Sequence, residues 1–473
     1  MLLQILLWLQ NTLSASMAIY GVGALVLLLG LVSLIAIQTG NISTTRRELR
    51  HLRKLGLPTS NMADQYDSKF DAPEGTETGS PVRIKAIYLH PVKSCGFVEV
   101  DRALLTKTGF MYDRCFALAT ETTEKDTVAP SKWRFISQRT KPNMSLVQTE
   151  LWLPHSGSNP RDPLVQAGGC VVLTFQDPGV PSWINQLETF LNTWDPSARP
   201  QLSFIAPLQP TPAQMDECQI RMKEFGIHSR DAMGLDMGKI PSVAAGLSKL
   251  KKFLDIPEHQ SFTLLRCTPD TLTRTDKNLA PLKHIGSPSV HGYTDQQPIN
   301  INSLSSVHGV SQHLPPENQP LDALRFRANI WITGAPAYDE ESWKRYRILP
   351  RPQNTPNTRE PRADVAPSLS VVCRTSRCTI PNVNLNTGTF DADIPRAGKK
   401  KGKAQPSTTL FEYRTVENGN KSALGYLGMH CVPEDRGLVE AEEQKVGLFV
   451  EVGDEIEVLE RGVHLYGSTA NEY

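Results

Sequence analysis

The chain has 473 residues, a length that allows two or three domains and a core large enough to fold without disulfides or structural metals. Its 50 Lys and Arg residues nearly balance 49 Asp and Glu residues, and this net charge of +1 argues against nucleic acid or an acidic macromolecule as a partner. With 39% hydrophobic residues, 35 Pro and 32 Gly, the composition is typical of a loop-rich, β-rich globular protein and excludes a coiled coil or a disordered chain. The eight cysteines are scattered, which favours a reducing compartment.

The N-terminal region predicts one membrane-spanning helix at residues 17–38, after a short tail at residues 1–16. The 22 residues of this segment are uncharged and nearly all apolar, and as a helix they extend about 33 Å, enough to cross a hydrocarbon layer of about 30 Å. The basic run from Arg46 to Lys54 predicts that everything after residue 45 faces the cytosol. A cleaved signal peptide is the alternative, but a basic leader and a small-residue cleavage site are both missing. Residues 39–80 are predicted to be a basic and polar linker.

The folded part begins near Pro81 with short strands. Residues 82–90 alternate apolar and polar side chains with the period of two that is typical of a half-buried strand. Residues 447–460 predict a β-hairpin that turns at Gly453 and Asp454. Further strands are predicted at residues 170–175, 327–334 and 369–373.

Helices are fewer, and the clearest one is predicted at residues 241–255. Its apolar side chains fall on one helical face behind Pro241, at Val243, Leu247, Leu250 and Leu254. The sequence therefore predicts an α+β, β-rich fold with two β-rich modules and peripheral helices.

Three segments have the composition of insertions: residues 121–132, 347–367 and 396–407. The third holds five cations and no anion, which in isolation would suggest binding to nucleic acid or anionic lipid. A solvated loop is the favoured interpretation.

Cys378 is the cysteine whose surroundings suggest chemistry. Four residues separate Cys373 from Cys378, and this spacing is a poor match to the two-residue knuckles of structural zinc sites. The adjacent guanidinium of Arg377 would favour a thiolate that serves as nucleophile or soft-metal ligand. Judged from these residues alone, Cys378 could instead be an ordinary buried cysteine of the core.

Several short blocks around Cys378 resemble a known family. The sequence SRCTIPNVNLNTGTF (376–390), followed by FEYR (411–414), resembles the signature of the MOSC domain. Upstream, RFRANIWITG (325–334) with ESW (341–343) is similar to another block of that family. HPVKSC (90–95) with FMYDR (110–114) is similar to its companion N-terminal domain. The resemblance covers residues 82 to 460 in the expected order.

The resemblance implies an architecture. An N-terminal, β-barrel-like MOSC-associated domain would occupy residues 81–262, and a MOSC β-barrel domain would occupy residues 263–462, before a C-terminal tail at residues 463–473. The membrane anchor favours the mitochondrial amidoxime-reducing components over the cofactor sulfurases within this family.

The resemblance also implies a bound molybdenum–molybdopterin cofactor. Such a ligand needs Lys and Arg for its phosphate, amide and hydroxyl groups for its pterin edges, and a soft thiolate for its metal. Cys378 would be the catalytic thiolate on molybdenum, with Ser376 and Arg377 positioning the cofactor beside it. The other implied cofactor-binding residues are Lys93, Ser94, Arg114, Arg327 and Asn329. Asp295 and Gln297 stand where relatives contact the pterin with a Thr-Ser-Pro stretch. For each of these residues the ordinary alternative is a surface cation or a satisfied turn residue.

The implied activity is the reduction of N-hydroxylated compounds (amidoximes, hydroxylamines and N-oxides) to amines. The resemblance implies cytochrome b5 and its NADH-dependent reductase as the electron donors. The sequence shows no flavin or dinucleotide fingerprint, which independently calls for an external donor. The resemblance favours the mitochondrial outer membrane with the enzyme in the cytosol, and the endoplasmic reticulum is the alternative. Two other functions stay open: a carrier of the cofactor or of sulfur that acts in trans through Cys378, and a membrane-tethered scaffold whose site has decayed.

Overall fold

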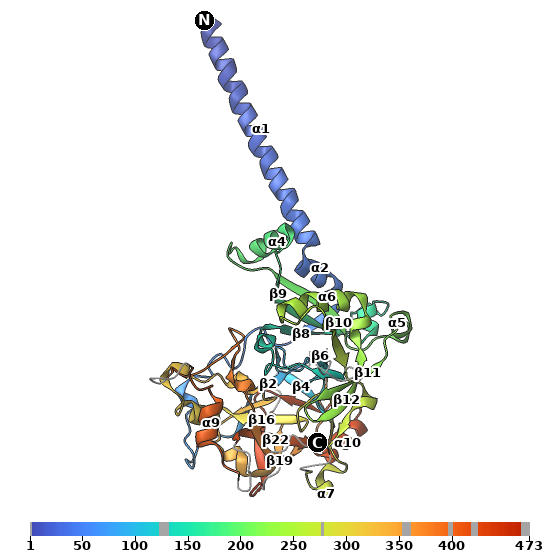
Figure 1. Cartoon of the computed structure of the whole chain (residues 1–473), viewed down its shortest axis with the longest axis vertical. Helices are drawn as coiled ribbons and strands as arrows, with labels where there is room; N and C mark the ends of the chain where they lie inside the picture. Colours follow the sequence, from blue (N-terminus) through green and yellow to red (C-terminus); the bar gives the residue numbers. More distant parts are fainter. Residues whose placement is uncertain are drawn as a thin grey trace.

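Helix α1 (Leu2–Thr39) projects as a long rod from one end of the rest of the chain (Figure 1). The computed structural model describes residues 2–122, 132–275, 279–351, 361–395, 401–417 and 424–464. Within this part, the segment Ile19–Thr39 is long and apolar enough to cross a membrane, close to the predicted span at residues 17–38. The helix already begins at Leu2, so residues 1–16 are not the separate tail that was predicted.

The base of α1 is fixed to the globular part through α2 (Asn41–Glu48), which follows it, and α4 (Trp183–Thr193). Gly40 ends α1 and precedes α2, which lies against α4. The buried carboxylate of Glu188 in α4 accepts hydrogen bonds from the backbone N–H groups of Ser43 (2.8 Å) and Ile42 (3.4 Å). A carboxylate is favourable at this position because the first N–H groups of a helix have no partner within the helix.

Gly40 allows this close approach, and its replacement by alanine is expected to loosen the base of α1. A Cβ at Gly40 would lie 2.2 Å from the Glu188 carboxyl carbon, which would push the carboxylate off the α2 N-terminus. We expect Gly40→Ala to cost about 1–3 kcal/mol, measured as a lower Tm in detergent. Gly21→Ala is the matched control, since a Cβ at Gly21 meets no atom within 4 Å. Equal Tm values for both variants would contradict this role of Gly40.

The predicted linker at residues 39–80 is partly a folded segment, which corrects the expectation of a free tether. Its strand β1 (Leu52–Leu55) pairs antiparallel with β8 (Gln148–Pro154). Leu49 and Leu52 are buried against β9 (Cys170–Gln176). The sheet β1-β8-β9-β10 is completed by β10 (Gln201–Pro207). The sequence does not predict this order, because strand pairing with the distant β8 leaves no local signal in a segment that is polar overall.

The N-terminal module contains a closed barrel. Its strand order is β11-β12-β13-β6-β7, and side chains such as Phe225 and Leu265 fill its interior. The strands are β6 (Phe116–Thr122), β7 (Lys132–Phe135), β11 (Met222–Ile227), β12 (Arg230–Asp236) and β13 (Phe262–Arg266).

The C-terminal module is a second, larger ring of strands. The sheet order is β17-β16-β22-β19-β18-β24-β2-β3, and pairing between β17 and β2 closes the ring. The strands are β2 (Arg83–Leu89), β3 (Val98–Val100), β16 (Ile299–Ser303), β17 (Ile330–Thr333), β18 (Trp343–Leu349), β19 (Ser368–Arg377), β22 (Gly425–Pro433) and β24 (Glu455–Arg461). The predicted α+β, β-rich class with two barrels is confirmed.

The modules exchange strands, so the predicted boundary at residue 262 does not separate them in space. Strand β2 lies within the first predicted domain but closes the ring of the second. Strand β13 extends beyond residue 262 but completes the first barrel. The C-terminal tail was predicted from residue 463, yet the His464 ring is buried and contacts the Trp343 carbonyl. Residues 465–473 lie outside the described ranges.

Smaller strands and helices complete the fold. The small strands are β4 (Arg102–Thr106), β5 (Gly109–Phe110), β14 (Thr273–Arg274), β15 (Val290–His291), β20 (Val383–Asn384), β21 (Thr389–Phe390) and β23 (Phe449–Glu451). The remaining helices are α3 (Pro163–Gln166), α5 (Pro212–Glu217), α6 (Pro241–Phe253), α7 (Leu282–Ile285), α8 (Leu304–Ser311), α9 (Ser407–Tyr413) and α10 (Asp435–Glu443).

The predicted hairpin at residues 447–460 is wrong in its pairing. The chain does turn at Gly453, where φ is +88°, but β23 pairs with β4 while β24 pairs with β18 and β2. The predicted helix at residues 241–255 is confirmed as α6, with Val243, Leu247 and Leu250 buried. The strand expected at residues 327–334 begins only at Ile330.

The predicted insertions are only partly described. Residues 123–131, 352–360 and 396–400 lie outside the described ranges. The second segment begins within β18, and its Arg362 is buried in an ion pair with Asp454 at 2.9 Å. At the end of the third, Lys403 is exposed and pairs with Glu412 at 3.1 Å.

Candidate functional site

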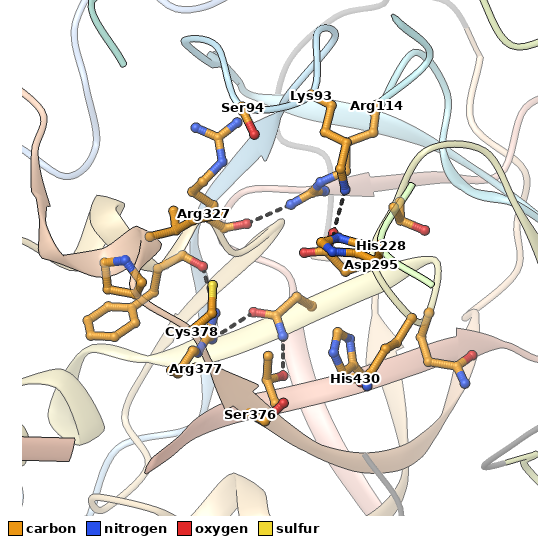
Figure 2. A pocket seen from close by; sticks show the side chains of 18 of the residues that line it. Lys93, Ser94, Arg114, His228, Asp295, Arg327, Ser376, Arg377, Cys378 and His430 are labelled. Carbon is orange, nitrogen blue, oxygen red and sulfur yellow. Dashed lines mark hydrogen bonds and ion pairs between the residues drawn. The ribbon is translucent and has the colours of Figure 1, made fainter. Parts of the chain in front are cut away.

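One cavity lies where the two barrels meet, and its volume is about 190 Å³ (Figure 2). Loops of the N-terminal barrel form one side, and β16, β19 and β22 of the second barrel form the other. All ten site residues predicted from the sequence line this cavity: Lys93, Ser94, Arg114, Asp295, Gln297, Arg327, Asn329, Ser376, Arg377 and Cys378. The structure therefore brings the predicted residues together, while the role of each stays a prediction.

Lys93 and Asp295 form a charged pair at one wall. The Lys93 side chain is only 7% exposed, and its Nζ donates to the Tyr293 carbonyl at 2.9 Å and pairs with the Asp295 carboxylate. The same carboxylate contacts Nε2 of His228 at 3.0 Å. Burial lowers the pKa of Lys93, and the positive charge of Arg114 lowers it further. Asp295 opposes both effects and thereby helps to keep the ammonium charged.

Two arginines connect the modules across the cavity. Arg114 donates from one Nη to the Arg327 carbonyl at 2.9 Å, and Arg327 donates to the Cys95 carbonyl at 2.8 Å. Burial lowers the pKa of Arg327 to about 10, with repulsion from Arg114 as the next cause. The second Nη of Arg327 is buried and has no hydrogen-bond partner in the described part of the chain.

Four residues of the cavity have left-handed backbone conformations that are uncommon for side chains other than glycine: His228, with φ +53°, and three residues predicted from the sequence. The φ angles are +67° at Ser94, +46° at Arg114 and +53° at Arg327. Such conformations cost of the order of 1 kcal/mol or more each and cluster at functional sites, where the surrounding fold enforces them. Here they direct backbone and side-chain groups toward one cavity.

Arg377 stabilises the end of β19, which Cys378 directly follows. Its guanidinium donates to the carbonyls of Leu427 and Phe326, both at 2.8 Å, and to Oδ1 of Asn300 at 3.2 Å. Burial lowers its pKa to about 9. Because these donors are used by the protein, Arg377 positions the end of β19 through backbone contacts.

Cys378 directly follows β19 and is the exposed member of the eight cysteines, all of which are free. Cys218 is half-buried and the other six are buried. Burial raises the pKa of Cys95 and of Cys431 to about 12, which keeps these thiols protonated. The exposed position of Cys378 at the cavity corrects the alternative of a buried core cysteine.

Sequence reasoning missed several residues of the cavity, above all two histidines. His430 on β22 is 7% exposed, and its Nδ1 has no hydrogen-bond partner among the described residues. Burial lowers its pKa to about 3, with the charges of Arg377 and Arg114 as further causes among its neighbours. His228 lies in the turn between β11 and β12, and burial lowers its pKa as well. The other missed lining residues include Phe135, Arg139, Asn300, Arg325 and Thr375.

The Glu-x-Trp and Tyr-Arg blocks recognised in the sequence do not line the cavity. Glu341 instead pairs with Arg414 and, at 2.7 Å, with Nε of Arg374. All three side chains are largely buried, and the Arg414 guanidinium lies 3.6 Å from the centre of the Tyr338 ring. These blocks hold β19 and α9 in place.

The cavity suits an anionic ligand with many hydrogen-bond acceptors. Its described lining carries six Lys or Arg side chains against one carboxylate. The unpartnered Nη of Arg327 and the unpartnered Nδ1 of His430 are groups that a ligand could satisfy. An exposed thiol beside them is a suitable ligand for a soft metal. These donors fit a phosphate-bearing pterin with a thiol-bound molybdenum.

Two protein-family models match the chain: the MOSC N-terminal beta barrel domain at residues 81–181 and the MOSC domain at residues 288–457. A comparison with curated proteins finds no match. The matched segments contain every residue predicted for the site.

Proposed function

Because the chain belongs to the MOSC family, a family of molybdenum cofactor-binding domains, we propose that its cavity binds a molybdenum–molybdopterin cofactor for the reduction of N-hydroxylated compounds. The observation that carries this proposal is the convergence of cations from both modules and the exposed Cys378 thiol on one cavity.

Each wall has a distinct task in this proposal. Lys93, Arg114 and Arg327 hold the phosphate and other anionic groups, because the described lining carries more cations than carboxylates and Arg327 keeps an unpartnered Nη. Asp295, Gln297 and the hydroxyls of Ser94 and Ser376 accept or donate hydrogen bonds along the pterin edges. The Asn329 side chain bridges the backbone of Asn300 and Tyr88, which keeps the wall rigid.

Cys378 would hold the molybdenum of the bound cofactor, and Arg377 fixes the end of the strand that precedes this thiol. When bound, the cofactor supplies the two-electron chemistry that converts an N–O group into an amine and water. The cationic wall excludes other cations and attracts anionic groups. His228 and His430 are neutral near pH 7 because burial lowers their pKa, so neither adds charge to the site.

The proposal includes a membrane location and an external electron donor. The apolar segment of α1 anchors the chain, with the globular part on the cytosolic side of the mitochondrial outer membrane. The endoplasmic reticulum is the alternative membrane. Electrons come singly from cytochrome b5, which its NADH-dependent reductase keeps reduced.

The test is to purify the full chain in detergent from a host that makes the cofactor and to measure molybdenum by plasma mass spectrometry. The expected result is close to one molybdenum per chain, together with reduction of an aromatic amidoxime that depends on cytochrome b5 and its reductase. Absence of both molybdenum and pterin would contradict the proposal.

A carrier of the cofactor or of sulfur that acts through Cys378 is the second candidate function, favoured by the exposure of this thiol. A carrier would release its cargo to an acceptor enzyme. Pterin without molybdenum, or persulfide on Cys378, would favour it over the reductase.

Arg327 provides a more specific test of the phosphate-binding wall. We expect Arg327→Met to reduce bound pterin and molybdenum about ten-fold or more, because a charge-assisted pair to phosphate is lost. Arg436→Met is the matched control, since Arg436 lies exposed on α10. Unchanged cofactor content in Arg327→Met, with unchanged Tm, would exclude Arg327 from ligand binding.

A further inference from the structure

Helix α4 presents an apolar face that the described protein does not cover. Trp183, Leu187, Phe190 and Trp194 follow one another at spacings of four, three and four residues, so they share one side of the helix and its C-terminal cap. Trp183 is 57% exposed and Trp194 is 76% exposed, and Phe190 is exposed as well. The Phe190 and Trp194 rings contact each other edge to face, with centroids 5.8 Å apart. Val180, in the loop before the helix, is 96% exposed.

The opposite side of α4 is fixed to the protein. Glu188 is its one charged residue, and this side chain is buried on the N-terminus of α2. Asn185 contributes its side-chain oxygen to the Asn41 N–H at 3.4 Å. The apolar face is therefore held in a defined orientation.

The place of α4 in the fold indicates what covers this face. The helix contacts α1 and lies at the end of the globular part from which α1 projects (Figure 1). The apolar segment of α1 ends at Thr39, directly before the α2 segment that packs on α4. A bilayer crossed by α1 would thus have its surface at the level of α4.

The chemistry of the neighbourhood matches a lipid surface. Tryptophan is enriched at the boundary between hydrocarbon and headgroups, where an amphipathic ring is stable. Arg46 and Arg47 are exposed on α2, whose N-terminus is bound to α4, and they can attract anionic lipid headgroups. Arg47 also donates to the Gln38 carbonyl at the end of α1, which fixes the arginine at this boundary.

We propose that α4 is an interfacial helix that inserts its Trp183, Phe190 and Trp194 face into the bilayer leaflet next to the globular domains. Together with α1 it forms a two-point attachment that sets the orientation of the cavity relative to the membrane. This inference rests on the membrane anchor of the proposed function and is independent of the cofactor and of the reaction.

The experiment uses the full chain reconstituted in vesicles that contain anionic lipid and phosphatidylcholine brominated near the headgroup. Bromine quenches tryptophan fluorescence on contact, and the chain has seven tryptophans. Replacement of both Trp183 and Trp194 by Phe removes these reporters but keeps the apolar face. We expect the amount of tryptophan emission that the brominated lipid quenches to fall about two-fold in this variant, because the Trp183 and Trp194 rings lie at the membrane interface in this proposal. Trp133→Phe, in the N-terminal barrel, is the control and should leave the quenched part unchanged.

Flotation of the same vesicles separates the possible failures. If the chain floats with the vesicles but the double variant is quenched like the wild type, α4 does not contact lipid and the inference is wrong. If the chain does not float, α1 is not an anchor, and both the membrane location and the inference fall. Neither result would bear on molybdenum content, which tests the cofactor proposal separately.

Discussion

Replacing Cys378 by alanine is expected to abolish amidoxime reduction, to less than about 1% of the wild-type rate, and to remove molybdenum from the purified chain. The thiol is exposed at the mouth of a cationic cavity and follows the last residue of β19. Since it makes little contact with the core, its loss should change the Tm hardly at all, within about 0.5 kcal/mol of stability. Plasma mass spectrometry, the cytochrome b5-dependent assay and a thermal melt on the same preparation give the three readouts.

The control for this variant is Cys218→Ala. Cys218 is half-buried and lies outside the cavity, so metal content and activity should stay at the wild-type level. Molybdenum near one per chain in Cys378→Ala would show that this thiol is not a ligand. Retained pterin with lost molybdenum would instead show that the cationic wall binds the cofactor without the thiolate.

The sequence predicted the elements that carry their own signal. In α6, the spacing of Val243, Leu247 and Leu250 is itself the reason these side chains are buried together. Strand β2 was predicted from alternation, and the structure shows that its second half is buried on both faces. That second half pairs with β17 on one edge and β3 on the other, which no local pattern could indicate.

The sequence did not allow us to predict which distant segments pair as strands. Residues 447–460 have the alternation and the glycine turn of a hairpin, yet β23 and β24 find their partners in different sheets. Strand β1 lies in the predicted linker because the stretch around it is polar and shows no apolar periodicity, and its order comes from pairing with β8. Strand propensity describes a half-buried surface and does not name the neighbouring strand.

The site shows the same division. The motif blocks predicted Lys93, Arg327 and Cys378, because each belongs to a short recognisable segment. His228 contacts Asp295 from 67 positions away in the chain, and His430 stands within a continuously buried strand. Neither has a local pattern that distinguishes it from a histidine of the core, so only the fold reveals that both line the cavity.

The ion pairs of Glu341 lead to the largest expected effect on stability. Glu341→Gln removes the carboxylate that Arg414 and Arg374 share in a largely buried place, and leaves Arg374 only the more distant Glu417 at 3.8 Å. Breaking a buried pair from one side typically costs about 3–5 kcal/mol, and the partial exposure of Arg374 puts our expectation near the lower limit. We expect a clearly lower Tm in detergent near pH 7, with the cavity residues themselves unaltered.

The neighbouring Glu340 is the matched control, and its effect should have a different dependence on pH. Burial and the charge of Glu341 raise the pKa of Glu340 from 4.5 to about 7, and its carboxyl accepts a hydrogen bond from the Ser306 hydroxyl at 2.8 Å. Between pH 4.5 and 7 the unfolded chain releases this proton while the native chain keeps it, so stability falls as the pH rises through this window. Glu340→Gln removes that loss and should be more stable than the wild type at pH 8, with little difference at pH 5. Thermal melts of both variants at pH 5 and pH 8 test this difference. If Glu340→Gln and Glu341→Gln changed the Tm equally at both pH values, the two carboxylates would not differ in charge. That result would contradict the different contacts that the two side chains make.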